Sequence, residues 1–167
     1  EACVSNAEAD MYQAKYLDLV ENLVGEASTW KANERLERDH LGVVPRVNVS
    51  IKVTSLCANF NPVAPEAAMS DFMSRATPVL EAAHRNGVLI NFDMEQHELK
   101  DLTLNTFMHA CEQVEFEPGI AMQAYLKSGV EDAKRIAEWA KRTGKVVTVR
   151  LVKGAYWDYE TIHAEQE

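Results

Sequence analysis

Cysteine is scarce in this sequence, and the three that occur lie far apart, at Cys3, Cys57 and Cys111. They form no CxxC pair and no Cys/His cluster, so the spacing typical of a zinc site is missing. A few scattered cysteines are typical of reduced thiols, buried or partly buried, in a cytosolic protein. Long apolar runs are also lacking, since none approaches the ~18 residues that a membrane span needs.

Positive charge is in deficit, because 17 Lys and Arg stand against 26 Asp and Glu, for a formal net charge of -9. Binding a phosphate backbone needs clustered cations, so this balance argues against a nucleic-acid partner. The glycine-rich phosphate motifs GxGxxG and GxxxxGKS/T are absent as well, and neither a Rossmann nor a P-loop site is indicated. A flavin stays possible, because α/β barrels bind phosphates through loops and helix starts.

The most informative stretch is VVTVRLVKGAYWD, at residues 146–158. Its first half is almost entirely β-branched or large and apolar, as expected of a parallel strand buried on both faces. Arg150 and Lys153 interrupt the end of that strand, and Gly154 breaks it. Charge at the end of a buried strand is typical of a site on an α/β barrel or open sheet. The loop expected after the strand carries two aromatic residues and an acid, Tyr156, Trp157 and Asp158.

Three earlier stretches repeat this pattern of an apolar strand with polar groups near its carboxyl end. They are VNVSIKVTSL at 47–56, GVLINFDMEQ at 87–96 and GIAMQAYL at 119–126. Their polar groups are, in chain order, Lys52, then Asp93 and Glu95, then Gln123. The carboxyl ends of parallel strands meet at one edge of a sheet, so these side chains should converge with Arg150 and Lys153.

Helical periodicity separates the strands. We expect helices over residues 5–24, 65–86, 98–114 and 129–143. Capping-box spacing marks the start of the first and the last, through the pairs Ser5/Glu8 and Ser128/Glu131. Gly25 should end the first helix. Pro78 should kink the second helix or begin a further segment.

Strands that alternate with helices call for right-handed crossovers and a parallel sheet. The strands are expected to be neighbours in chain order, at residues 46–56, 88–94, 119–125 and 146–152. We therefore predict an α/β fold, a partial (β/α)8 TIM-type barrel of about four βα units. Residues 1–45 would form an N-terminal helix and a connecting segment, and residues 46–167 the first half of the barrel. A whole barrel takes ~250 residues, so we expect a piece of a longer protein.

Taken together, RLVKGAYWD, NFDME, MQAYLK and NVSIKVTSL resemble the flavin-dependent proline dehydrogenase barrel of bacterial proline utilization A proteins. The resemblance runs from about Arg46 to Glu160. It implies FAD as cofactor and oxidation of L-proline to 1-pyrroline-5-carboxylate in proline catabolism, with a quinone as electron acceptor. It also implies a cytoplasmic location, and leaves open peripheral membrane association and an aldehyde dehydrogenase module further along the parent protein.

The resemblance assigns the cofactor to the last two strands. Arg150, at the end of the last strand, is our candidate beside the flavin N5, and Gln123 suits the pyrimidine edge. Trp157 matches a residue near the adenine. The positions that follow the phosphates and ribityl chain belong to the same cofactor-binding set, and they are Val152, Lys153, Gly154 and Ala155. Gly154 lacks a Cβ, which lets the backbone approach another group closely.

The substrate side falls on the first two strands. By resemblance, Lys52 would pair with the proline carboxylate, and Tyr156 would line the substrate pocket. Asp93 would form an ion pair with Lys52 or hold the orientation of the ring, since a buried lysine needs a carboxylate partner to keep its charge. Glu95 is turned the same way as Asp93, one step further out, and its role stays open.

Two other interpretations remain open from the residues alone. One is a Schiff-base aldolase, with Lys52 or Lys153 as nucleophile and Asp93 as its acid-base partner. The other is a non-catalytic half-barrel that self-associates through its open sheet edges. The chain also contains no match to the family's later substrate-binding arginines, so we expect residues 1–167 alone to be inactive.

Overall fold

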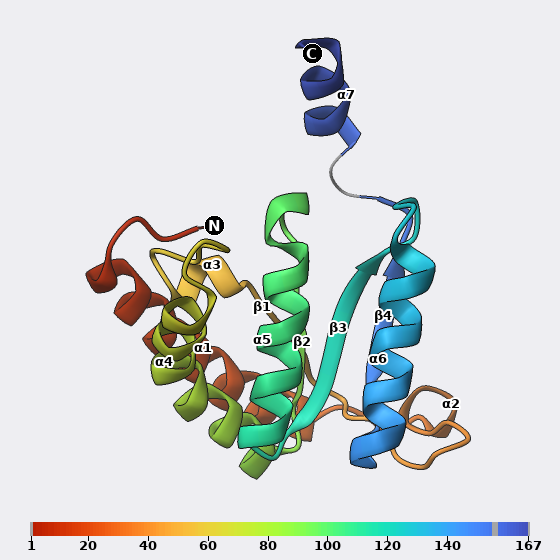
Figure 1. Cartoon of the computed structure of the whole chain (residues 1–167). Helices are drawn as coiled ribbons and strands as arrows, with labels where there is room; N and C mark the ends of the chain where they lie inside the picture. Colours follow the sequence, from red (N-terminus) through yellow and green to blue (C-terminus); the bar gives the residue numbers. More distant parts are fainter. Residues whose placement is uncertain (1, 155–156, 167) are drawn as a thin grey trace.

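The computed structural model of the chain describes residues 2–154 and 157–166. Its sheet has the strand order β1-β2-β3-β4, with every neighbouring pair parallel (Figure 1). The strands are β1 (Asn48–Ile51), β2 (Leu89–Phe92), β3 (Glu117–Gln123) and β4 (Thr148–Val152). The predicted order and direction of the strands are confirmed, and their carboxyl ends lie at one edge.

Helices occupy the connections between these strands, and further helices precede β1 and follow β4. The long ones are α1 (Asn6–Ser28), α4 (Pro65–Asn86), α5 (Lys100–Gln113) and α6 (Gly129–Thr143). The short ones are α2 (Glu34–Glu37), α3 (Val53–Leu56), the 3-10 turn η1 (His97–Leu99) and α7 (Trp157–Gln166). Figure 1 shows α4, α5 and α6 side by side on one face of the sheet, with α7 beyond the carboxyl ends of the strands.

One face of the sheet packs on these helices through a row of aromatic rings. Phe92 of β2 lies between Phe72 of α4 and Phe107 of α5, with ring centroids 5.7 and 5.3 Å apart. Trp139 of α6 continues the row, 6.0 Å from Phe107. Each ring is buried, so the row ties three successive βα units into one core.

The outermost strand is less well covered on the same face. Val149 and Leu151 alternate with Arg150 along β4, and they are 43% and 69% exposed. In a parallel sheet both faces are normally covered, so apolar residues on the helix-facing side of a strand are usually buried. β4 is therefore a strand with one exposed apolar face at the edge of the described sheet.

The predicted strand through residue 56 is wrong at its end, because β1 stops at Ile51 and α3 follows. Ser55 turns the chain there, since both its backbone N–H and its Oγ–H donate to the carbonyl of Lys52, at 3.1 and 2.7 Å. Such a side-chain bond to nearby backbone competes with a strand ladder. The turn places Lys52 at the end of the strand instead of inside it.

Two predicted helix signals are also wrong, and a third is wrong in one of its two alternatives. Helix α1 continues through Gly25 to Ser28, and Gly25 is not among the glycines with positive φ, so it does not form a left-handed cap. Helix α4 continues past Pro78 as one helix, so a second segment is wrong and a kink at Pro78 stays a prediction. Ser128 does not cap α6, because its hydroxyl donates to Asp132 Oδ2 at 3.1 Å instead. The Ser5 cap is present, with Ser5 Oγ accepting from the N–H of Glu8 at 3.2 Å.

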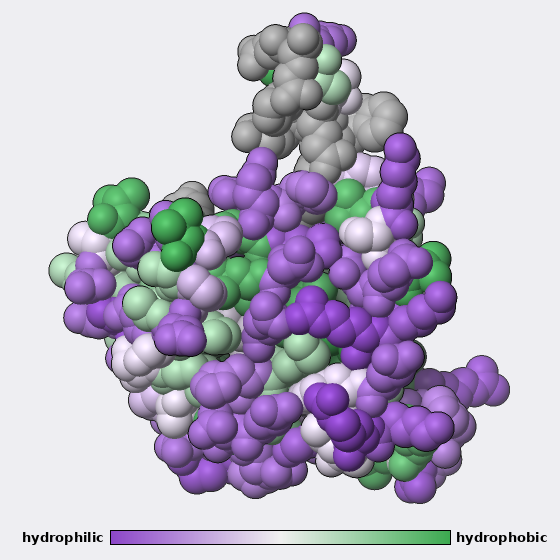
Figure 2. Space-filling model, viewed as in Figure 1, coloured by the Kyte–Doolittle hydropathy of each residue, from purple (hydrophilic) through white to green (hydrophobic). Residues whose placement is uncertain are grey.

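The three cysteines lie buried with free thiols. Burial raises the pKa of Cys57 and of Cys111 to about 12 each, so these thiols stay protonated at neutral pH. In the part of the chain that the structure describes, no helix combines the length and the apolar character needed to cross a membrane. Figure 2 shows a mainly hydrophilic surface over the outer side of α5 and α6.

Candidate active site

A polar cluster joins three strands on the sheet face opposite the helices. Arg150 of β4 donates through Nη1 to Ser50 Oγ at 3.1 Å, and its Nη2 forms an ion pair with Asp93 Oδ1. Asn91 Nδ2 donates to the same oxygen of Asp93 at 3.2 Å. Asp93 and Arg150, predicted to converge from their places at strand ends, are therefore in contact.

Small residues on β3 let the guanidinium of Arg150 cross from β4 to β1. Gly119 and Ala121 occupy this face of β3, where register pairs Gly119 with Asn91 and Ala121 with Arg150. A Cβ on Gly119 would stand 2.9 Å from Leu89 Cδ2 and 3.2 Å from Asn91 Oδ1. The absence of side-chain bulk there leaves the long arginine free to lie over β3, with 48% of its side chain exposed.

The carboxylate beside Lys52 is that of Glu95, and not that of Asp93 as considered from the sequence. Lys52 Nζ lies 3.8 Å from Glu95 Oε1, while Asp93 pairs with Arg150. Glu95 is held in turn by Thr54, whose Oγ1 donates to Glu95 Oε2 at 2.7 Å. The predicted alternative of a Lys52–Asp93 ion pair is wrong, because the turn at α3 carries Lys52 toward Glu95. Much of the Lys52 side chain remains exposed.

Gln123 ends β3 on the face that Arg150 shares, and register pairs it with Val152. It is buried, and its Oε1 accepts no hydrogen bond from any residue that the structure describes. Buried polar atoms are normally paired, so this amide has acceptor capacity for a group outside the described residues. The neighbouring ladder continues past the strand ends, where the N–H of Tyr125 donates to the carbonyl of Lys153 at 2.9 Å.

Gly154 allows a close approach, and in the structure the group that approaches is a side chain of the protein. A Cβ at this position would lie 2.4 Å from Cδ1 of Tyr125, closer than real contacts allow. Lys153 beside it is exposed. Trp157 begins α7, so the predicted loop at Trp157 and Asp158 is wrong. Ala155 and Tyr156 lie outside the described residues.

Several side chains of the cluster were not predicted. Ser50 and Asn91 stand two residues before Lys52 and Asp93, so strand alternation alone could have placed them on the same face. Tyr16, whose hydroxyl accepts the N–H of Lys52 at 3.2 Å, and Thr54 give no such signal, because the fold of α1 and α3 brings them to the site. Among residues 2–154 and 157–166, no three His, Cys, Asp or Glu are placed to hold a metal ion.

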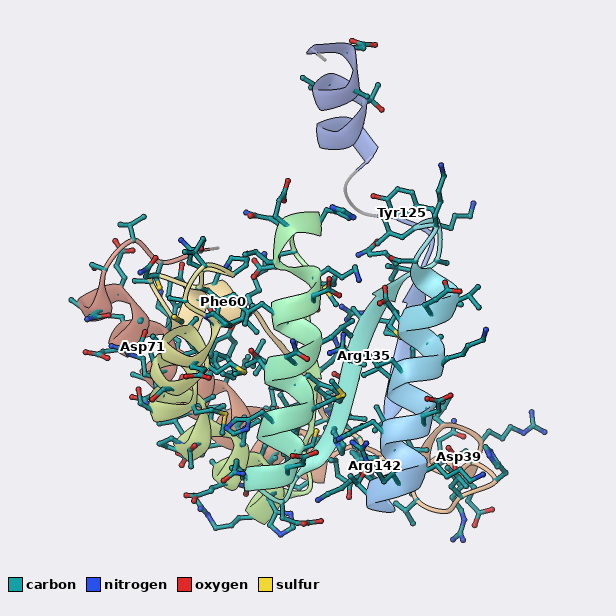
Figure 3. The ribbon with its side chains drawn as sticks, viewed as in Figure 1. Asp39, Phe60, Asp71, Tyr125, Arg135 and Arg142 are labelled. Carbon is teal, nitrogen blue, oxygen red and sulfur yellow. The ribbon has the colours of Figure 1, made fainter. Side chains whose placement is uncertain are left out.

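A groove with a volume of about 480 Å³ lies elsewhere, on the outer surface between α5 and α6. Its lining residues are Met108, Glu131, Lys134, Arg135, Glu138, Trp139 and Arg142. Figure 3 shows Arg142 near the end of α6 that is opposite to Tyr125. Barrel enzymes place their chemistry at the carboxyl ends of the strands, so we assign the candidate site to the cluster around Arg150.

Parallel strands, helices on the outer face and charged side chains gathered at the carboxyl edge define this protein as part of a TIM-type α/β barrel, with its candidate site at the carboxyl ends of the strands. The family model described as proline dehydrogenase matches residues 1–167, and the chain belongs to that family.

A solved structure and named bacterial proteins are similar to this chain, in keeping with this family assignment. The crystal structure of proline utilization A from Bdellovibrio bacteriovorus, inactivated by N-propargylglycine, is 42% identical with a TM-score of 0.91, and the match covers 99% of this chain and 18% of that one. The "Bifunctional protein PutA" of Klebsiella aerogenes is 26% identical over all of this chain and 12% of its own length. That of Rhizobium meliloti is 28% identical over 74% of this chain and 10% of its own. The chain therefore spans only a small part of these relatives.

Proposed function

We propose that this chain supplies the first half of the active site of an FAD-dependent proline dehydrogenase, which oxidises L-proline to 1-pyrroline-5-carboxylate. The observation that carries the proposal is the contact of Arg150 with Asp93 and Ser50 across the carboxyl ends of the strands. Family membership supports an oxidoreductase acting in proline catabolism. It also favours this reaction over the Schiff-base aldolase.

The described residues fit a flavin in their chemistry. Gln123 offers a buried acceptor with no partner among them, and Arg150 offers a half-exposed cation. The remaining cofactor-binding set that we propose is Val152, Lys153, Gly154, Ala155 and Trp157. When bound, the flavin supplies the acceptor for the hydride that leaves proline. The protein's own part is to orient the substrate and to hold positive charge at the site.

On the substrate side we propose Lys52, Asp93 and Tyr156. Lys52 would attract the proline carboxylate, because its ammonium group is accessible and only 3.8 Å from Glu95, which keeps it oriented. Asp93 would act mainly by fixing the guanidinium of Arg150. The later strands of the barrel would add the rest of the carboxylate site. They would also cover Val149 and Leu151 on β4.

The wider setting follows from the same proposal. We infer a quinone as the electron acceptor and a cytoplasmic location for the parent protein. We also infer that an aldehyde dehydrogenase module follows in the parent protein, because the relatives are bifunctional by name. Self-association of the isolated chain through the free edge of β4 is the competing outcome, since an unpaired strand edge favours pairing with another copy.

The test compares the full-length protein that carries this chain with residues 1–167 alone. We expect L-proline to remove the visible flavin absorbance of the full-length protein under anaerobic conditions. Residues 1–167 with added FAD should show no dye-linked proline oxidation. Half of the site would be missing and the rest exposed to water, which weakens its charge interactions.

Other results would contradict the proposal in distinct ways. Flavin absorbance that proline leaves unchanged would reject proline oxidation. Borohydride trapping of a carbonyl compound on Lys52 or Lys153 would point to the aldolase. Turnover by residues 1–167, together with a solution mass of two chains, would show that copies complete each other.

A further inference from the structure

The backbone N–H and C=O of Lys52 are both held by hydrogen bonds to side-chain hydroxyls. The N–H donates to the hydroxyl of Tyr16 at 3.2 Å, and the carbonyl accepts the hydroxyl of Ser55 at 2.7 Å. The two hydroxyls are themselves 3.1 Å apart. Since Ser55 gives its proton to the carbonyl, Tyr16 must donate to Ser55 Oγ. The three residues therefore form a closed ring of hydrogen bonds in which each residue donates one bond and accepts one. Hydrogen bonds linked in this way polarise and strengthen one another.

This ring brings a distant helix to the end of β1. Tyr16 lies on α1, which also packs on α4 and on the α3 turn. The segment before α1 makes a second attachment to that turn, because Cys3 donates its N–H and its Sγ–H to the carbonyl of Thr54, at 2.9 and 3.2 Å. The first polar residue after β1 is thus fixed from outside the sheet, by residues far away in sequence.

We propose that Tyr16 is a positioning residue for Lys52, so that α1 belongs to the substrate side of the site and is more than a packing helix. This rests on the proposed role of Lys52 in attracting the substrate carboxylate. Among the described residues, the 3.8 Å contact of its Nζ with Glu95 is the one ion pair of the Lys52 side chain. The backbone, which the Tyr16 hydroxyl holds through the N–H of Lys52, therefore acts together with Glu95 to set the direction of this side chain.

The experiment is Tyr16→Phe in the full-length protein. This change removes the Tyr16 hydroxyl and opens the ring of hydrogen bonds, while the aromatic packing stays. We expect KM for L-proline to rise about two- to tenfold, the effect of the one net hydrogen bond that Tyr16 makes to the Lys52 backbone, with kcat nearly unchanged. Oxidation of pyrrolidine, which has the ring but no carboxylate, should be unaffected. Amide hydrogen exchange of the segment 51–56 should become faster, and this readout does not depend on activity.

Two further variants control the result. Ser55→Ala removes the hydroxyl that donates to the Lys52 carbonyl and should raise KM for proline in the same way. It therefore tests the inference if Tyr16→Phe folds poorly. Gln13→Met removes a different bond of α1, from Gln13 Nε2 to the carbonyl of Arg75 at 2.9 Å, and should leave KM for proline unchanged.

The inference is overturned if Tyr16→Phe speeds amide exchange at residues 51–56 but leaves KM for proline unchanged. The hydrogen-bond ring would then stabilise the turn without positioning the Lys52 side chain. It is equally overturned if Gln13→Met raises KM for proline as much as Tyr16→Phe does, or if Tyr16→Phe also weakens oxidation of pyrrolidine. Either result would indicate that the substitutions loosen the fold in general. Failure of the wild-type protein to oxidise proline rejects the proposed function itself, and the exchange data still report separately on the ring.

Discussion

Replacing Arg150 by Met in the full-length protein should slow proline-dependent reduction of the flavin by about 30- to 900-fold. This corresponds to the ~2–4 kcal/mol that one preorganised donor contributes where charge develops in a transition state. A methionine fills similar space without a charge or a donor. The loss should appear in the rate of reduction far more than in folding, because Arg150 is half-exposed on a free strand.

Part of that loss belongs to Asp93, which would keep only Asn91 as a described partner once the guanidinium is gone. A double-mutant cycle with Asp93→Asn separates the two contributions. Arg150→Lys keeps the charge but cannot reach both Ser50 and Asp93 with one planar fork, so we expect an intermediate rate.

The rates are best measured by rapid mixing of anaerobic enzyme with proline, alongside thermal unfolding of each variant. Arg142→Met is the matched control, since Arg142 lies on the outer groove at the other end of α6. Unchanged reduction by Arg150→Met, or an equal loss in Arg142→Met, would show that Arg150 has a structural role alone.

The sequence was most informative where chemistry and periodicity agreed. Apolar strands that alternate with helices predicted the order of the parallel sheet. The charged residues near the strand ends predicted that Arg150 and Asp93 would be in contact. The division of the chain at residues 45 and 46 stays a prediction. Residues in turns were harder, because their partners are decided by how elements pack. Ser55 bonds back to Lys52 and ends β1 early, which redirects Lys52 to Glu95.

Local signals also lost to tertiary contacts at glycine and serine. Gly25 resembles a helix stop, yet α1 continues to Ser28 as it packs along α4. Ser128 has capping-box spacing, but its hydroxyl bonds to Asp132, a carboxylate that is already engaged by a lysine from another helix. A single sequence does not contain that information, since the lysine lies 32 positions away.

That lysine, Lys100, is the basis of the second large prediction. It begins α5 and is 7% exposed, and its Nζ lies 2.8 and 3.0 Å from the two carboxylate oxygens of Asp132 on α6. Asp101 accepts a further bond at 2.8 Å. Burial alone would lower the pKa of Lys100, but its bonds to Asp101 and Asp132 outweigh this and raise it above the ordinary value. The pair joins two helices directly behind Gln123, with which both residues line a small cavity.

Lys100→Met should lower the free energy of opening of α5 and α6 by ~3–5 kcal/mol, because it leaves the 8% exposed Asp132 buried without a cation. Lys100→Met combined with Asp132→Leu should recover most of this, since an apolar pair of similar volume is often as stable as a buried ion pair. Lys145→Met, which breaks the partly exposed pair with Glu115, is the surface control and should cost ~0–1 kcal/mol.

The pH dependence follows from the raised pKa of Lys100. A lysine whose folded pKa is raised contributes fully below its unfolded pKa, about 10.4, and this contribution is lost as the pH rises through the folded value. The difference in stability between wild type and Lys100→Met should therefore be constant from neutral pH to about pH 10 and shrink above it. Amide hydrogen exchange across α5 and α6 in the full-length protein measures it. A loss below 1 kcal/mol, or a double variant no more stable than Lys100→Met, would mean that water already reaches Asp132 and that the pair does not hold the two helices together.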